Sequence, residues 1–394
     1  MQELARRHEV SAIALFDPER DPERFERAMG AYCQEVRLVP SRGEGLAKRL
    51  AQARSLFSRE SFEAGYFLIP AFQDALDQLL SRRDFDILIL SAGLFLTRYR
   101  FRPGHSNDSP PLVLDEHNLE FDLQRQMAKS GSVLRRIHNA VNWPKIRREE
   151  IDDWRRYDGV TFTSTHDEKR ARALVPSMRS AVVPNAVDLR SFRPEPGDPP
   201  SDGRTVMFFG INDYPPNTDG ILFFLREVWP RLAASHPRAR LKIVGPRPTP
   251  EVLGQRSPRV EVKGAVDDVR PHLAEAAAVI VPLRLGGGTR LKILEAMAMA
   301  KPIVSTSIGA EGIDVVHEKH LLLADDPADF AAALGRVLDD PRLAARLGEE
   351  GRALVSARYS WEASARRLEG FLGEVLAANG ARSSPDASRR SSQG

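Results

Sequence analysis

The segment GGGTRLKILEAMAMAKPIVST, Gly286–Thr306, restricts the possible folds more than any other stretch of the chain. The apolar run AVIVPLR comes before it and is typical of a buried parallel strand. Three glycines then allow a sharp turn, and Thr289 predicts the N-cap of a helix that leads to a further strand. A strand, a glycine turn, a helix and a second strand in this order predict a parallel α/β sheet.

The chemistry of this turn indicates an anion site. The turn consists of the glycines Gly286, Gly287 and Gly288. Glycines let the backbone approach a ligand closely, and the N–H groups of a first helical turn favour an anion. Arg290 and Lys292 place two positive charges at the N-terminus of the predicted helix, where the helix dipole disfavours cations. A bound anion would account for these charges, and a diphosphate fits. Glu295 follows Lys292 by three residues, so its carboxylate can accept from two ribose hydroxyls. The alternative is an ordinary surface turn with a Lys–Glu pair.

The whole string resembles the donor-binding segment of the retaining GT-B glycosyltransferases of family 4, in a Gly-rich branch with the loop GGGTRLKILEAMA. The resemblance implies an α/β GT-B fold, with two Rossmann-like domains that face each other across a cleft. It also implies that Glu295 binds the nucleotide ribose and that the preceding loop binds the sugar diphosphate. Many members of the family carry another glutamate eight positions earlier, where this chain has Gly287.

Length and composition fit a protein of this kind. At 394 residues the chain is long enough for two domains with separate cores. Its 57 basic and 54 acidic residues nearly balance, so no nucleic-acid partner is expected. Cys33 is the single cysteine, which excludes an internal disulfide and suits a reducing compartment. No apolar run approaches about 20 residues and no signal peptide opens the chain, so we expect a cytoplasmic protein.

The alternation of strand and helix patterns predicts two domains in tandem. A segment with prolines at positions 194, 196, 199 and 200 separates them. The segment 122–157 has a helical pattern throughout. The expected organisation is a Rossmann-like acceptor domain over 1–190, a linker over 191–203, a Rossmann-like nucleotide-sugar donor domain over 204–356, a helix over 357–380 that returns to the first domain, and a disordered tail over 381–394.

The start of the chain is unusual for this family. The first sixteen residues, MQELARRHEVSAIALF, have the pattern of the end of a helix that runs directly into a strand. In the family that the chain resembles, a first strand and a Gly-rich loop come earlier, and that strand is central in the sheet. We therefore expect the first strand of the N-terminal domain to be missing before Met1.

Two further loops are candidates for donor binding. Gly210 ends an apolar strand pattern and Asn217 stands near the start of the next helix, in a loop that lines the cleft in the resembling family. These two residues either contact the donor or only shape the loop. The resemblance also places the nucleobase near Gly245 and Val269. Helix capping is the alternative explanation for Asp267 in the same turn.

The motif DEHN, Asp115–Asn118, ends another strand pattern at the edge where open α/β sheets bind ligands. A single histidine often has only a structural role. The resemblance implies that His117 faces the donor sugar or the acceptor. Asp115 and Glu116 either orient His117 or meet sugar hydroxyls. The predicted catalytic residues are therefore His117, Arg290 and Lys292.

The segment 124–157 predicts a peripheral contact with the inner face of a membrane. It holds nine Arg or Lys and four Asp or Glu, with Trp143, Trp154 and Tyr157 between them. Basic and aromatic residues together suit an anionic lipid surface that carries a lipid-linked acceptor. A solvated helix face is the alternative reading of the same charges.

Together with these patterns, the resemblance implies a retaining glycosyltransferase of polysaccharide biosynthesis, of hexosyltransferase type. It would use a nucleotide diphosphate sugar as donor and a glycan, a lipid-linked molecule or a small molecule as acceptor. No metal ion and no further cofactor are expected, because the loop N–H groups and the two cations can stabilise the leaving diphosphate. The alternatives are a nucleotide-sugar epimerase of the same fold and a non-catalytic sugar-nucleotide binder.

Overall fold

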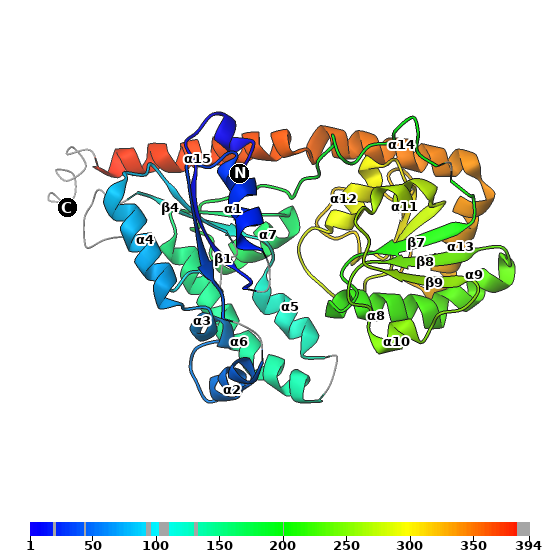
Figure 1. The fold of residues 1–394 in the computed structure, drawn as a ribbon, viewed down its shortest axis with the longest axis horizontal. Helices are drawn as coiled ribbons and strands as arrows, with labels where there is room; N and C mark the ends of the chain where they lie inside the picture. The colour runs from blue at the N-terminus through cyan, green and yellow to red at the C-terminus, as the bar shows by residue number, and fades with distance from the viewer. Residues whose placement is uncertain are drawn as a thin grey trace. The chain divides into compact units, whose positions relative to one another are not determined.

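The computed structural model describes residues 1–18, 21–42, 45–91, 96–101, 110–129, 133–199 and 201–383. The chain forms two compact units (Figure 1). Unit 1 comprises Met1–Val183 and the residues from Ala365 onward, and unit 2 comprises Pro184–Ser364. Each unit has a hydrophobic core of its own. The expected linker, 191–203, is grouped with unit 2, and Phe192 packs against the core of that unit.

Unit 2 is an open sheet of six strands with the order β12-β11-β10-β7-β8-β9. Every neighbouring pair is parallel. The strands are β7 (Thr205–Phe209), β8 (Arg240–Val244), β9 (Val260–Gly264), β10 (Ala278–Val281), β11 (Ile303–Ser305) and β12 (Leu322–Leu323). Every residue of β7 and β10 is buried, as expected for central strands with both faces covered.

Helices connect these strands and cover both faces of the sheet. They are α8 (Pro215–Phe223), a π-helical turn (Phe224–Val228), α9 (Trp229–Ser235), α10 (Pro250–Leu253), α11 (Arg270–Glu275), α12 (Leu291–Ala298), α13 (Pro327–Asp339) and α14 (Pro341–Arg358). Figure 1 shows α8 and α10 on one face of the sheet and α11 and α12 on the other. Asp326 and Asp340 cap the N-termini of α13 and α14 with their carboxylates.

Unit 1 contains two parallel sheets, one with the order β1-β2 and one with the order β3-β4-β5-β6. The strands are β1 (Ser11–Phe16), β2 (Glu35–Pro40), β3 (Leu88–Ser91), β4 (Leu112–Glu116), β5 (Gly159–Phe162) and β6 (Ser180–Val182). The predicted α/β class is thus confirmed, since all named strand pairs are parallel. The strand expected before Met1 stays a prediction.

The helices of unit 1 begin with a 3-10 turn (Leu4–Arg6). They continue as α1 (Pro22–Gly30), α2 (Leu46–Ser55), α3 (Phe62–Tyr66), α4 (Pro70–Arg82), α5 (Glu120–Met127), α6 (Val133–Arg156) and α7 (Thr165–Leu174). The helical pattern predicted over 122–157 is confirmed for most of that segment, in which α5 ends at Met127 and α6 begins at Val133. The intervening sequence contains Ser130, Gly131 and Ser132, which are poor helix formers.

The final helix, α15 (Trp361–Ser383), begins in unit 2 and belongs to unit 1 from Ala365 onward. Within unit 1, Phe371 and Val375 form a small core cluster with Val113. A Cβ on Gly159 would lie 2.8 Å from both of these α15 side chains, so glycine is required where β5 passes the helix. The tail expected to be disordered over 381–394 is helical up to Ser383, and the remainder lies outside the described residues.

Across the described ranges, no helix is long and apolar enough to span a bilayer.

Candidate functional site

The strand order of unit 2 brings four candidate loops to one edge of its sheet. The loops follow β10, β7, β8 and β9, which are adjacent in that order, and all four strands are parallel. The loops therefore lie together at the carboxyl ends of the strands. The chain order reverses between β7 and β10, and open α/β sheets bind ligands at such a switch point. The glycine turn after β10 and the Gly210 loop after β7 flank this point.

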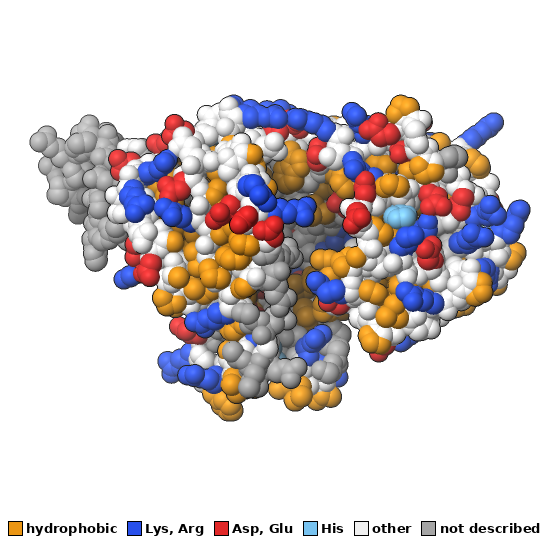
Figure 2. Space-filling view, in the orientation of Figure 1, with side chains coloured by type: hydrophobic (Ala, Val, Ile, Leu, Met, Phe, Trp, Pro, Cys, Tyr) orange, Lys and Arg blue, Asp and Glu red, His pale blue; other side chains and the backbone are white. Residues whose placement is uncertain are grey.

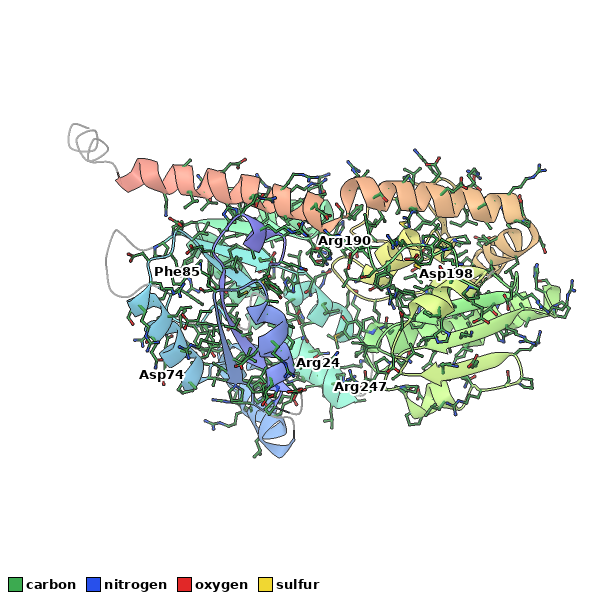
Figure 3. All side chains as sticks on the ribbon, turned by 45° about the horizontal axis from the view of Figure 1, so that its top comes forward. Arg24, Asp74, Phe85, Arg190, Asp198 and Arg247 are labelled. Atoms are coloured by element: carbon green, nitrogen blue, oxygen red, sulfur yellow. The ribbon has the colours of Figure 1, made fainter. Side chains whose placement is uncertain are left out.

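The loops after β7 and β8 touch through their backbones. Gly210 and Gly245 have φ values of 145° and 139°, which L-residues with side chains rarely adopt. A Cβ on Gly245 would lie 1.8 Å from the carbonyl oxygen of Gly210. Arg247, labelled in Figure 3, donates from Nε to Asp213 Oδ2 at 2.7 Å and ties the two loops together. Glycine at both positions thus allows a close approach that any side chain would prevent.

The glycine turn is arranged around the side chain of Arg290. Gly286 and Gly288 have φ values of 133° and 69°. A Cβ on Gly286 would lie 2.5 Å from Arg290 Nη2. Arg290 Nη1 donates to the carbonyl oxygens of Gly287 and Gly288. The guanidinium group therefore holds the shape of the loop and also adds positive charge to it.

The helix after this turn begins later than the sequence predicted. Its N-cap is Arg290, and α12 starts at Leu291, so the prediction of Thr289 as N-cap is wrong. Arg290 has extended backbone angles and makes no side-chain capping hydrogen bond. Thr289 instead remains within the turn. The close packing of the loop around Arg290 determines where the helix starts, in place of the capping preference of threonine.

The side chain of Lys292 contacts residues at the switch point between β7 and β10. Its Nζ donates to Asn217 Oδ1 at 2.8 Å and lies 4.2 Å from the centroid of the Phe208 ring. A Cβ on Gly210 would lie 2.9 Å from the same Nζ. Burial, reinforced by the charge of Arg290, lowers the pKa of Lys292 to about 7. The loop after β7 has no basic residue of its own, and Lys292 of α12 supplies one.

Asn217 connects this lysine to the loop after β7. Its Nδ2 donates to the carbonyl oxygen of Ile211 at 2.8 Å, while its Oδ1 accepts from Lys292. Both of its functional groups therefore contact the protein. These contacts fit the shaping role weighed from the sequence, and contact of Asn217 with the donor stays a prediction.

Glu295 and Val269 differ in their surroundings. Glu295 lies one turn beyond Lys292 on α12 and is half-buried. Burial raises the pKa of Glu295, and the charge of Lys292 opposes this effect. Val269 follows β9 at the far edge of the sheet, and its side chain packs against the core of unit 2. Val269 is only partly buried, so contact of this residue with the nucleobase stays a prediction.

In unit 1, the carboxyl ends of β3, β4 and β5 hold a polar cluster around His117. His117 Nε2 lies 2.9 Å from Ser91 Oγ and 3.4 Å from Asp115 Oδ2. Thr161 Oγ1 donates to Asp115 Oδ1 at 2.7 Å. The hydrogen bond with Asp115 raises the pKa of His117, although burial acts in the opposite direction. Asp115 thus orients His117, as predicted from the DEHN motif.

Glu116 does not share this role. It follows Asp115 along β4, so its side chain lies on the opposite face, where it is buried. Glu116 Oε1 accepts from Trp154 Nε1 at 2.9 Å, and burial raises the pKa of Glu116 to about 8. The expectation that Glu116 orients His117 is therefore wrong.

Two of the three aromatic residues named in the segment 124–157 are placed differently from the prediction. Trp154 packs between Phe121 and Phe162 and is 1% exposed. Tyr157 is buried as well. These two side chains belong to the core of unit 1, so they cannot face a lipid surface.

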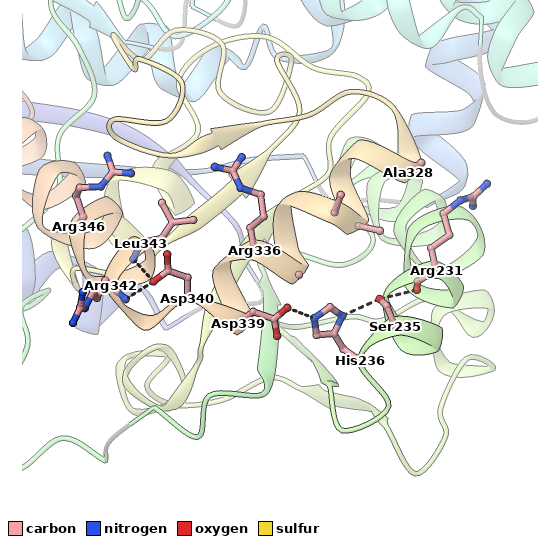
Figure 4. Close-up of a pocket in the computed structure, with 13 residues that line it drawn as sticks. Arg231, Ser235, His236, Ala328, Arg336, Asp339, Asp340, Arg342, Leu343 and Arg346 are labelled. Atoms are coloured by element: carbon pink, nitrogen blue, oxygen red, sulfur yellow. Dashed lines mark hydrogen bonds and ion pairs between the residues drawn. The ribbon is translucent and has the colours of Figure 1, made fainter.

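A further cavity lies elsewhere on unit 2. It is a groove of about 950 Å³ between α9 and the α13–α14 corner (Figure 4). His236, paired with Asp339 at 3.2 Å, lies in it beside Arg336, which pairs with Glu318 at 2.9 Å. Because α9 ends just before β8 begins, this groove lies at the amino ends of the strands. It is therefore separate from the loops at the carboxyl ends.

Three residues that contribute to these sites were not predicted from the sequence. Asn212 is fully buried, and its Nδ2 donates to the carbonyl oxygen of Gly245 at 2.8 Å. Phe208 lies beneath Lys292, and Ser91 contacts His117. Ser91 and Asn212 each stand at or just after the carboxyl end of a strand. That position was the signal that would have identified both.

Within the described residues, no group of three or more His, Cys, Asp or Glu side chains is arranged to hold a metal ion.

Residues 203–340 match the family model described as glycosyl transferases group 1. The gpi3 subunit of the phosphatidylinositol N-acetylglucosaminyltransferase of Schizosaccharomyces pombe is 29% identical over 222 residues, which cover 54% of this chain and 47% of that protein. The phosphatidyl-myo-inositol mannosyltransferase of Mycolicibacterium smegmatis is 31% identical over 189 residues, or 45% of this chain and 48% of that protein. The chain spans about half the length of these curated relatives.

Solved structures resemble the chain over most of its length. Sucrose-phosphate synthase from Thermosynechococcus elongatus superimposes with a TM-score of 0.70 and 20% identity, covering 96% of this chain and 92% of that chain. The Anabaena protein HepE, in complex with UDP and glucose, superimposes with a TM-score of 0.59 and 15% identity and covers 89% of each chain. Residues 203–340 are thus similar to the glycosyl transferases group 1, and the fold of the chain is that of the GT-B glycosyltransferases.

Proposed function

We propose that the protein is a retaining glycosyltransferase that takes a hexose-type sugar from a nucleotide diphosphate sugar. The observation that carries this proposal is the position of Lys292. Its ammonium group lies at the switch point of the unit 2 sheet, against the backbone of Gly210, and donates to the neutral oxygen of Asn217. A diphosphate at this point would supply the negative charge that restores the usual pKa of Lys292.

The loop geometry supports a diphosphate site without a metal ion. At Gly210, Gly245 and Gly286 the backbone has positive φ values, which residues with side chains rarely adopt. No side chain therefore occupies the loops at these three positions. The first turn of α12 has no side-chain cap, so its N–H groups suit the phosphate oxygens. Glu295, further along the same helix, would bind the ribose hydroxyls.

The proposed reaction breaks the bond between the anomeric carbon and the diphosphate oxygen. The acceptor hydroxyl attacks the same carbon from the same face, and its proton passes to the leaving phosphate oxygen. Lys292 and the N–H groups of the glycine turn stabilise the charge that develops on the diphosphate. Because the leaving group accepts the proton, His117 orients a sugar rather than acting as a base.

The relatives indicate the class of substrate. Two of them are named for transfer to phosphatidylinositol derivatives, and HepE was solved with UDP and glucose. The proposed acceptor is accordingly a glycan, a lipid-linked molecule or a small molecule, in polysaccharide or glycolipid synthesis. The reaction would take place in the cytoplasm, where nucleotide sugars are the donors.

A thermal-shift panel tests this proposal. The panel contains UDP-glucose, UDP-N-acetylglucosamine and GDP-mannose. At least one donor should raise the melting temperature of the wild-type protein, and Lys292→Met should lose that shift. Lys319→Met is the matched control, because Lys319 is exposed and its pairing with Glu350, at 3.9 Å, is loose. A panel without any shift, or an unchanged shift in Lys292→Met, would contradict the proposal.

Product analysis separates transfer from the two alternatives. The donor that gives the shift is incubated with and without a mixture of acceptor glycans and lipids. Release of nucleoside diphosphate that depends on the acceptor is expected. Conversion of the sugar without any acceptor would indicate an epimerase, and a donor shift without turnover would indicate a binding protein.

A further inference from the structure

One end of unit 1 exposes apolar side chains to an unusual degree. Phe57, just after α2, is 93% exposed, and Leu134, near the start of α6, is 82% exposed. Val133, Leu50 and Ile137 have exposures of 67%, 57% and 52%. Val133, Leu134 and Ile137 belong to α6, and their spacing places them on one side of the helix. Contiguous apolar groups of this kind mark interaction surfaces rather than ordinary surface positions.

Hydrogen bonds hold the two elements that carry these residues together. Lys145 of α6 donates to the carbonyl oxygen of Ser55 at the end of α2, at 2.5 Å. Asn142 of α6 accepts from the backbone N–H of Phe62 and donates to Glu63, both in α3. The Phe62 ring also meets the His138 ring at a centroid distance of 6.1 Å. These contacts join the middle of α6 to the end of α2 and to α3. We call the exposed residues of α2 and of the first turns of α6, together with Phe57, the α2–α6 tip.

The charges of the α2–α6 tip are mostly positive. The segments 46–59 and 133–148 contain nine Lys or Arg and no Asp or Glu, and the acidic residues Glu60 and Glu149 directly follow them. Arg54, Arg135 and Arg136 are exposed beside the apolar residues. Figure 2 shows hydrophobic and basic side chains next to each other at the end of unit 1 where Figure 1 places α2. Apolar groups within a cationic surface are the combination found in proteins that lie on membranes.

We propose that the α2–α6 tip docks onto a membrane surface that contains anionic phospholipid. Phe57 and Leu134 would enter the region between headgroups and acyl chains, while the arginines pair with lipid phosphates. A nucleic acid would satisfy the arginines but would leave five large apolar side chains in water. The apolar exposure therefore favours a lipid surface over a nucleic acid.

This surface differs from the one that the sequence suggested. The aromatic residues Trp154 and Tyr157 are buried in the core, and the membrane-facing groups are aliphatic residues of the first turns of α6 together with Phe57. The tip belongs entirely to unit 1, whereas the diphosphate site belongs to unit 2. Docking is therefore independent of donor binding, and either proposal can fail without the other.

Sedimentation with lipid vesicles tests the docking proposal on the full chain. Vesicles of phosphatidylcholine alone are compared with vesicles that contain about 30% phosphatidylglycerol. The protein should sediment with the anionic vesicles, and raising the salt concentration should weaken this binding. Absence of binding to anionic vesicles would overturn the proposal, as would equal binding to both kinds of vesicle.

Substitutions in the α2–α6 tip test whether this surface is the docking site. Phe57→Glu together with Leu134→Glu should lower the partition coefficient on anionic vesicles at least ~10-fold, because both apolar anchors are lost. Arg135→Ser together with Arg136→Ser should lower it on the order of tenfold. Val316→Glu is the control, since Val316 is an exposed apolar residue of unit 2, and this variant should bind as the wild type does.

Unchanged binding of both double variants, with circular dichroism spectra like that of the wild type, would show that the tip is not the docking site. Displacement of bound protein by RNA with no loss of binding in Phe57→Glu/Leu134→Glu would assign the surface to nucleic acid instead and overturn the proposal.

Discussion

At the scale of single residues, Lys292 links the structure of unit 2 to its chemistry. A lysine that is desolvated and paired with a neutral amide loses its proton more easily than a lysine in water. Its pKa of about 7 means that roughly half of the molecules carry this charge at neutral pH without an anion nearby. A bound diphosphate favours the charged form, so donor binding and protonation of Lys292 are linked.

This linkage predicts how donor affinity depends on pH. Above pH 7 the donor must bind together with a proton, because the neutral lysine predominates in the unbound protein. The dissociation constant of a nucleotide sugar should therefore be about tenfold higher at pH 8 than at pH 6. Isothermal titration in buffers of different ionisation enthalpy should show proton uptake at pH 8.

Lys292→Arg provides the matched comparison for this titration. A guanidinium group stays charged throughout the range, so any donor binding that remains in this variant should be independent of pH. A wild-type affinity that does not change between pH 6 and pH 8 would disprove the linkage.

At the scale of elements, α6 organises unit 1 through its polar side chains. Glu150 accepts from the backbone N–H groups of Glu120 and Phe121, both at 2.9 Å, and so caps α5. Glu149 accepts from the N–H of Ser61 at 2.9 Å in the same way before α3. Carboxylates from a distant helix thus satisfy groups that a local N-cap would otherwise satisfy.

Removal of the Glu150 carboxylate should destabilise unit 1. Glu150→Ala leaves two buried N–H groups without an acceptor, which costs about 1–3 kcal/mol in the free energy of unfolding. Asp152→Ala is the control on the same helix, because its side chain is 62% exposed, and it should stay within about 0.5 kcal/mol of the wild type. Urea denaturation followed by circular dichroism measures both values. Equal stabilities of the two variants would show that the cap contributes nothing.

At the scale of the whole molecule, each unit has a main hydrophobic core of its own. The core of unit 2 surrounds β7 and β10, and that of unit 1 surrounds β4 and β5. The proposed donor site lies entirely in unit 2, and a ligand stabilises the unit that binds it by mass action.

A nucleotide sugar should therefore protect the two units unequally. At a donor concentration of about 100 times the dissociation constant, unit 2 should gain about 2.7 kcal/mol. Hydrogen exchange of amides in β7 and β10 should slow by up to about 100-fold, while exchange in β4 and β5 should change little. If hydrogen exchange in β4 slowed as much as in β7 and β10, the two units would either unfold together or share the donor site.

The patterns of the chain were sufficient for its fold class and for the local structure around the glycine turn. The run of β-branched residues before Gly286, the three glycines and the helix with Lys292 and Glu295 all appear in the structure at the expected positions. These features depend on neighbours within a few residues, which is the range over which glycine conformations and strand patterns act. The same local reasoning misplaced the start of α12, since the contacts of Arg290 with the loop outweigh the preference of Thr289 for capping.

What the sequence by itself determined is therefore the alternation of strands and helices and the chemistry of each loop. Only the tertiary structure decided which loops meet, because the order β10-β7-β8 depends on pairing between strands far apart in the chain. It also decided that Glu116 and Trp154 face the core while Phe57 and Leu134 face outward. Burial depends on what packs against a residue from other elements, and no pattern within one segment contains that information.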